Sequence, residues 1–161
     1  MIDTKNLDAA IAEAHQAATL RDVGKIAAQF LQTEYPKGSP LVMSPITSGG
    51  VMRGGTPWAT GNLRRLEKAI TILHEAGIPV FNQLAFKSII DKHRVRWRES
   101  DKSHANAYYE AILFDFYGPI IETDLVKVVF LLPQYKKSRS CKFVRRMVLN
   151  RHGLTFDVPI A

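Results

Sequence analysis

The stretch Phe130-Leu131-Leu132-Pro133-Gln134-Tyr135-Lys136-Lys137-Ser138-Arg139-Ser140-Cys141 decides the predicted fold. A continuous apolar run ends at Pro133, a short polar turn follows, and an apolar segment with a basic face begins near Ser138. This order is typical of a buried parallel strand that leads into a helix. The helix dipole and free N–H groups favour an anion there, and the hydroxyls of Ser138 and Ser140 add donors. The stretch therefore predicts a site for a small phosphorylated ligand, and we expect a nucleotide.

On either side of this stretch, strand patterns alternate with helix patterns along the chain. We expect strands at residues 41–43, 78–82, 125–132 and 154–158, and helices at 62–76, 105–116 and 140–151. Such alternation predicts an α/β fold, a parallel sheet covered by helices on both faces. The charged segment 92–104 has little periodicity, so we expect it to be an exposed loop.

Residues 1–38 are predicted to form an N-terminal helical extension. Apolar residues recur there at helical spacing, and a segment with two prolines and a glycine, residues 35–40, breaks the pattern. The predicted division is therefore an extension over 1–38 and an α/β domain over 39–161. The extension either packs on that domain or forms a contact between identical chains, so a homo-oligomer is one expectation.

The formal net charge of +7 is unevenly spread along the 161 residues. The segment 136–151 contains basic residues and no acidic residue: Lys136, Lys137, Arg139, Lys142, Arg145, Arg146 and Arg151. Such a cluster attracts anions, whether the anion is a nucleotide, a nucleic acid or a membrane surface. A solvated helix face would produce the same pattern.

The composition limits the remaining classes. A single cysteine, Cys141, excludes an intramolecular disulfide and a multi-cysteine metal site, and the five histidines share no metal-ligand spacing, so no metal or cofactor is expected. No apolar run reaches the ~18 residues needed to span a membrane, and no secretory signal pattern opens the chain. We therefore expect a cytoplasmic protein that has no membrane partner.

Ligands of parallel sheets bind beyond the carboxyl ends of the strands. Here Ser44 and Asn82 follow strand patterns; Ser44 is either a loop opener or a ligand contact, and Asn82 is a candidate for reading a base edge. The loop after the first strand contains Thr47, Gly49 and Gly50, and its glycines would let the backbone approach a phosphate closely.

At the basic segment, two interpretations stay open. Arg139 offers a bidentate fork that suits phosphate, and Ser138 and Ser140 are phosphate donors in this interpretation. Serine is also a favoured residue at the start of a helix, so both serines have a purely structural alternative. Asp124 is likewise either a turn residue before a strand or a contact to a sugar.

Several segments occur in an order and spacing that match a known family. They are Ser44-Pro45-Ile46-Thr47, Gly77-Ile78-Pro79-Val80-Phe81-Asn82, Asp124 before a strand, and Leu132-Pro133 followed by Tyr135 and Ser138-Arg139-Ser140-Cys141. Residues 41–158 thereby resemble the nucleoside 2-deoxyribosyltransferase-like superfamily, which includes nucleoside 5′-monophosphate N-glycosidases. The resemblance implies a flavodoxin-like sheet and a pocket for a nucleoside or nucleotide.

The resemblance also implies roles for residues. It brings the loop Ser44–Gly50 to the sugar and base, gives Asp124 the positioning of the reacting sugar, and gives Ser138 the 5′-phosphate. The family's segment Ser-x-Gly-x-x-x-Glu supplies a nucleophilic glutamate, but here Ser140 replaces the glycine and Val144 stands at the glutamate position. Valine can neither attack nor stabilise an oxocarbenium-like centre.

The sequence thus predicts a protein that binds a nucleoside monophosphate or a similar small phosphorylated ligand. Cleavage or transfer at the N-glycosidic bond stays open, because the usual carboxylate is missing. The alternative is a nucleic-acid-binding or assembly protein that uses a catalytically silent version of the fold.

Overall fold

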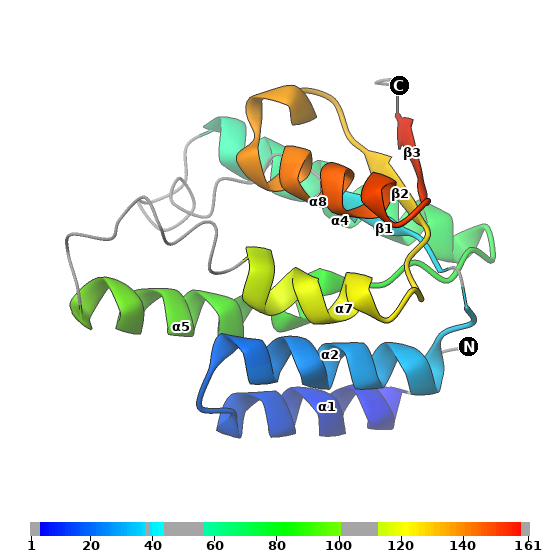
Figure 1. Ribbon diagram of the computed structural model, residues 1–161. Coiled ribbons are helices and arrows are strands. Elements are labelled where there is room, and N and C mark those ends of the chain that lie inside the picture. The colour runs from blue at the N-terminus through cyan, green and yellow to red at the C-terminus, as the bar shows by residue number, and fades with distance from the viewer. Residues whose placement is uncertain (1–3, 38, 44–56, 101–112, 159–161) are drawn as a thin grey trace. The chain divides into compact units, whose positions relative to one another are not determined.

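The computed structural model describes residues 4–37, 39–43, 57–100 and 113–158 (Figure 1). The chain forms two compact units, and each unit is built from two separate segments. The first unit comprises Met1–Lys37 and Gln83–Leu125, and the second comprises Gly38–Asn82 and Val126–Ala161. One boundary therefore falls at residues 37 and 38, while the predicted division into domains 1–38 and 39–161 stays a prediction.

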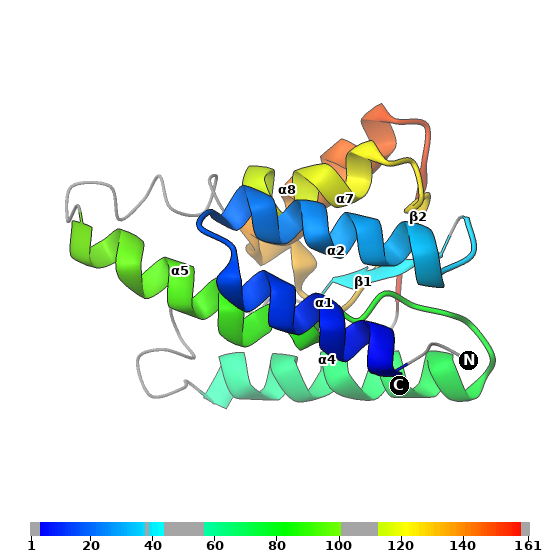
Figure 2. The ribbon, with the colours of Figure 1, turned by 90° about the horizontal axis from the view of Figure 1, so that it is seen from below.

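The first unit is helical. Its elements are α1 (Thr4–Gln16), α2 (Leu20–Glu34), the 3-10 helix η1 (Gln83–Phe86), α5 (Lys87–Ser100), the π-helical turn η3 (Leu113–Tyr117) and α7 (Gly118–Glu122). Figure 2 shows α2 lying between α1 and α7. Helix α2 begins at a Thr19 cap, whose hydroxyl oxygen accepts a hydrogen bond from the Asp22 N–H at 3.1 Å.

The core of the first unit depends on a close approach between α2 and η3. Val23, Ala27 and Leu31 are fully buried on one face of α2. At Gly24 on the same helix, a Cβ atom would lie 2.3 Å from the carbonyl oxygen of Asp115. Real Cβ atoms do not approach a backbone oxygen so closely, so the two segments can pack in this way only because residue 24 is glycine.

The second unit contains the sheet. Its elements are β1 (Leu41–Met43), α4 (Pro57–Glu75), β2 (Val128–Leu131), the 3-10 helix η4 (Tyr135–Lys137), α8 (Arg139–Asn150) and β3 (Leu154–Asp157). The strands are parallel in the order β1-β2-β3, with β3 at one edge (Figure 1). Side chains alternate along β2: Val129 and Leu131 are fully buried, whereas Val128 and Phe130 are half-buried.

Helix α8 returns the chain from β2 to β3. Its apolar stripe, Cys141, Val144 and Val148, is buried, and the helix packs on β2 and β3. The turn that follows is tight, because a Cβ atom at Gly153 would lie 2.4 Å from a methyl carbon of Val148 and 2.8 Å from the carbonyl oxygen of Lys127. In the β2–α8–β3 segment, the predicted order of strand, helix and strand is confirmed.

The predicted flavodoxin-like α/β fold, with a parallel sheet covered by helices on both faces, is wrong. The described residues are mostly helical, and the sheet has three strands of three or four residues. The predicted strand 78–82 contributes one isolated bridge, between Leu41 and Phe81. Pro79 has no N–H to donate, and the N–H of Val80 bonds locally to the carbonyl of Ile78 at 2.9 Å, so this segment cannot extend the ladder.

Two further expectations differ from the structure. Residues 92–100 belong to helix α5 and do not form the predicted loop, while 101–112 lie outside the described residues. The predicted strand 125–132 shortens to β2, because the turn after α7 reaches into its start: Asp124 has a positive φ of 58°, and the Leu125 N–H donates to Thr123 Oγ1 at 3.3 Å.

We expect Gly24→Ala to destabilise the protein by about 1–3 kcal/mol, because the new methyl group meets backbone atoms that cannot turn aside. The matched control is Gly61→Ala in α4, where a Cβ atom meets nothing within 4 Å. There the change should stabilise by about 0.5–1 kcal/mol through helix propensity alone. Thermal and urea unfolding followed by circular dichroism measure both effects. A Gly24→Ala protein as stable as the wild type would contradict the close approach.

Candidate functional site

The start of α8 is built by a serine cap. Ser138 has extended backbone geometry (φ −106°, ψ 123°), and its Oγ accepts a hydrogen bond from the Cys141 N–H at 3.2 Å. Its own N–H donates to the Tyr135 carbonyl at 2.9 Å, and its carbonyl accepts from Lys142 at 3.1 Å. The Ser138 residue is buried, with 5% of its surface exposed. The structural alternative for this residue, a helix cap, is therefore realised.

Helix α8 presents opposite chemistry on its two sides. The buried stripe of Cys141, Val144 and Val148 leaves the other side to exposed residues. Three of these are basic and follow helical spacing: Lys142, Arg145 and Arg146. Because residues three and four apart lie on the same helix face, these three cations form one continuous surface.

This surface forms one wall of a hollow of about 580 Å³, which we call the basic groove. Helix α8, η4 and β3 all contribute to it. Its lining residues are Tyr135, Lys136, Lys142, Arg145, Arg146, Leu149, Asn150 and Asp157. The Tyr135 hydroxyl donates a hydrogen bond to Asp157 Oδ2 at 3.2 Å, which ties η4 to the edge strand β3.

The charge of the basic groove is strongly positive, with four basic side chains and one carboxylate, or three net positive charges. Among the described residues, no ion pair is formed by Lys136, Lys142, Arg145 or Arg146. All four side chains are exposed. Cations of one sign gathered in a concave surface raise the local concentration of anions, so the groove is suited to holding a phosphate-bearing ligand.

Several residues predicted for the ligand site cannot be placed. Ser44, Thr47, Gly49 and Gly50 lie outside the described residues. Asn82 is half-buried and directly follows the single bridge residue Phe81. Their assignment to a ligand stays a prediction.

Asp124 belongs to the first unit and the start of α8 to the second, and a shared role for them in a ligand site stays a prediction. Asp124 lies in the left-handed turn after α7, the structural alternative for this residue, and is half-buried. Arg139 and Ser140 are the first two residues of α8, beside the Ser138 cap. Val144, at the position of the family's glutamate, is fully buried in the apolar stripe of α8.

Cys141 is a buried residue of the same stripe. Burial raises the pKa of its thiol to about 11, although a hydrogen bond with the Ser138 side chain opposes the rise. The thiol is therefore protonated at neutral pH, and a thiol is a poor nucleophile.

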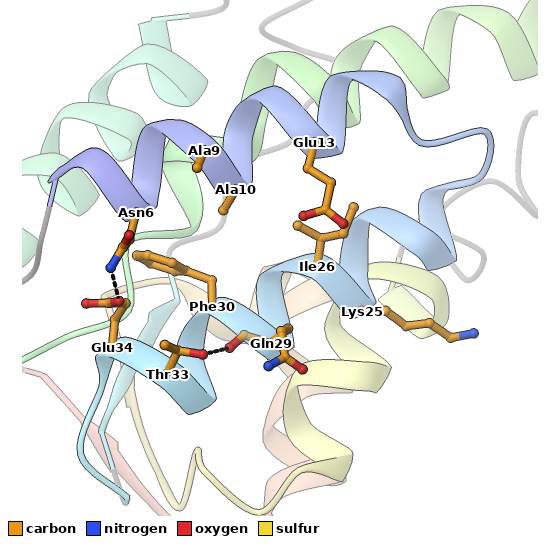
Figure 3. A pocket seen from close by; sticks show the side chains of 10 residues that line it. All are labelled: Asn6, Ala9, Ala10, Glu13, Lys25, Ile26, Gln29, Phe30, Thr33 and Glu34. Carbon is orange, nitrogen blue, oxygen red and sulfur yellow. Dashed lines mark hydrogen bonds between the residues drawn. The ribbon is translucent and has the colours of Figure 1, made fainter.

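A second hollow, of about 430 Å³, lies between α1 and α2 (Figure 3). Small and apolar residues such as Ala9, Ala10 and Phe30 line it, and at one end the Asn6 side-chain amide donates to a Glu34 carboxylate oxygen. Its charged lining residues, Glu13, Lys25 and Glu34, are of both signs, and its lining contains no nucleophile beside a base. We interpret it as space left where two alanines face a helix, and the basic groove remains the candidate site.

The described residues contain no group of three or more His, Cys, Asp or Glu side chains placed to hold a metal ion. None of the described helices has the length and apolarity that a membrane crossing requires.

The sequence showed the basic cluster, and the assignment of the ligand to Ser138, Arg139 and Ser140 stays a prediction. The groove itself was not predicted, although the spacing of Lys142, Arg145 and Arg146 on one helix face was a signal for its basic wall. The contact between Tyr135 and Asp157 had no sequence signal, because 22 residues separate the partners.

We expect Cys141 to resist thiol reagents in the native protein. A pKa of about 11, against the usual 9.0, leaves roughly a hundredfold less thiolate at pH 8. Labelling with dithiobis-nitrobenzoate at pH 8 should be slow in buffer and fast in urea, which supplies the control. Rapid labelling of the folded protein at pH 8 would contradict a buried thiol.

With the geometry described, the chain was compared with protein-family models, curated proteins and solved structures, and none of the three comparisons gives a match. The resemblance to the nucleoside 2-deoxyribosyltransferase-like superfamily therefore stays a prediction. Roles for its residues have to come from the arrangement of the chain itself.

Proposed function

We propose that the protein binds the phosphate backbone of nucleic acid in the basic groove. The observation that carries the proposal is the gathering of Lys136, Lys142, Arg145 and Arg146 around one hollow, without an ion-pair partner among the described residues. Lysine and arginine contacts to phosphates release counterions from nucleic acid, and this release supplies most of the affinity of sequence-independent binding.

Two features favour a polymer over a nucleoside monophosphate. Pockets for small ligands bury most of the ligand surface, whereas the four cations of the groove are exposed to solvent. The Ser138 hydroxyl, the predicted phosphate donor, is buried and accepts the hydrogen bond that caps α8. Binding of a nucleoside monophosphate at the start of α8 is the competing outcome of the experiments below.

In the proposed complex, the basic groove contacts the phosphates of the nucleic acid and not its bases. Tyr135 is the aromatic residue that lines the groove, and its hydroxyl is bonded to Asp157, so base stacking has little support. We therefore propose binding without sequence preference. A cytoplasmic location, where nucleic acid is accessible and a thiol stays reduced, is part of this proposal.

The salt dependence of binding tests the proposal directly. If the four cations each neutralise one phosphate, the logarithm of the association constant for duplex DNA should fall with the logarithm of salt concentration at a slope of about −3.5. Affinity should therefore drop roughly a hundredfold between about 50 and 200 mM salt. Fluorescence anisotropy with labelled duplexes of unrelated sequence gives the slope. No binding at the lower salt concentration would overturn the proposal.

A charge-matched pair of variants locates the binding surface. We expect Arg145→Ala/Arg146→Ala to reduce the steepness of the salt slope by about 2, because two phosphate contacts are lost. The control is Arg64→Ala/Lys68→Ala, which removes the same charge from exposed positions on α4. Equal weakening by both pairs would show a diffuse charge effect and would remove the groove from the proposal.

A panel of nucleosides and their 5′-monophosphates separates this proposal from the function that the family resemblance implies. We expect no free base after incubation, because position 144 carries a buried valine where the family has its carboxylate. Chromatographic detection of free base measures this. Base release that is lost in Asp124→Ala would instead favour N-glycosidic chemistry.

A further inference from the structure

The outer edge of β3 carries backbone groups that take no part in the basic groove, although the Asp157 side chain lines that groove. The Leu154 N–H donates to the Lys127 carbonyl at 2.7 Å, and the Val158 N–H donates to the Leu131 carbonyl at 2.9 Å. Alternate residues of a strand point their backbone groups the same way, so Leu154, Phe156 and Val158 face β2. The backbone groups of Thr155 and Asp157 consequently face outward, away from the sheet.

Those outward groups have no hydrogen-bond partner within the part of the chain that the structure describes. An edge strand with unpaired N–H and C=O groups is a template for another strand, and proteins commonly block such edges with lysine, proline or a bulge. The strand Leu154-Thr155-Phe156-Asp157 is short, but it contains no lysine or proline, and its register with β2 runs without a bulge. Its only charged residue is Asp157.

The edge is also apolar on one face. Leu154 and Phe156 are 59% and 49% exposed. The register pairs Phe130 with Phe156, and their rings lie with centroids 5.9 Å apart, so the exposed ring continues an aromatic row across the sheet. Parallel sheets are normally covered on both faces, which makes exposure of two large apolar side chains at an edge unusual.

We infer that the β3 edge pairs with the β3 edge of a second copy of this chain, antiparallel and around a two-fold axis at Phe156. This register places Thr155 opposite Asp157 of the other copy, and these are the residues whose backbone groups face outward. Each such pair exchanges two hydrogen bonds. It also places Phe156 opposite its own copy in the close, non-hydrogen-bonded position, and Leu154 opposite Val158.

In this register the strand is self-complementary, because the side chains that face each other across the pair are compatible. No like charges face each other, because the carboxylate of Asp157 meets the Thr155 hydroxyl. A register centred on Asp157 would instead set two carboxylates opposite each other. Pairing around a two-fold axis consumes both edges, so it yields a closed dimer and not a fibre. The inference does not depend on the proposed nucleic-acid binding.

Size-exclusion chromatography with light scattering, over a micromolar concentration range, tests the dimer. Phe156→Lys should raise the dimer dissociation constant roughly thirtyfold or more, as loss of a central aromatic contact does. The matched control is Ile72→Lys on α4, an apolar residue of similar exposure at 51%. A wild-type protein that stays monomeric at every concentration, or a Phe156→Lys protein that stays dimeric, would overturn the inference.

A second variant addresses the backbone itself. Thr155→Pro removes one outward N–H without removing a bond to β2, so it should abolish the dimer while Thr155→Ala retains it.

The rate of backbone amide exchange in the wild-type protein tests the same pairing without a variant. The Thr155 and Asp157 amides should become protected as protein concentration rises, and fast exchange of both at the highest concentration would contradict the pairing.

Discussion

Burial of the apolar stripe of α8 against the sheet is the interaction on which the second unit depends. The stripe of Cys141, Val144 and Val148 fixes how the helix is rotated about its axis, and that rotation turns its basic side to solvent. The Ser138 cap fixes where the helix begins. The position of the groove is therefore a consequence of hydrophobic packing, while its positive charge comes from exposed residues that contribute little to stability.

The fold could be predicted where sequence signals were local and dense. The β2–α8–β3 segment combines an apolar strand, a proline stop, a serine cap and a glycine turn, and each signal supports the others. Prediction failed where tertiary context decides. Segment 78–82 has the residues of a strand but the hydrogen bonding of a turn, and residues 92–100 form α5 despite weak periodicity. Because of these errors, the sequence predicted an α/β fold where the described residues are mostly helical.

The positive charge of the candidate site could be predicted from the sequence, but the groove that gathers this charge could not. Clustered cations near residue 140 are visible in the sequence, and they predict an anion. Whether Ser138 serves a ligand or the helix depends on its burial and on the direction of its hydroxyl, which no sequence pattern gives. The Tyr135–Asp157 contact that closes one side of the groove joins residues brought together only by folding.

The interleaving of the two units has a consequence for biosynthesis. The chain passes between the units after residues 37, 82 and 125, so neither unit is a continuous piece of sequence. When α1 and α2 leave the ribosome they can pack on each other, but the face of α2 that contacts η3 and α7 has no partner until those elements are made. Residues 38–125 take roughly 4–18 seconds at about 5–20 residues per second. During that interval the nascent chain has to keep the α2 face that will contact η3 and α7 without those partners, so the first unit can be completed only late in synthesis.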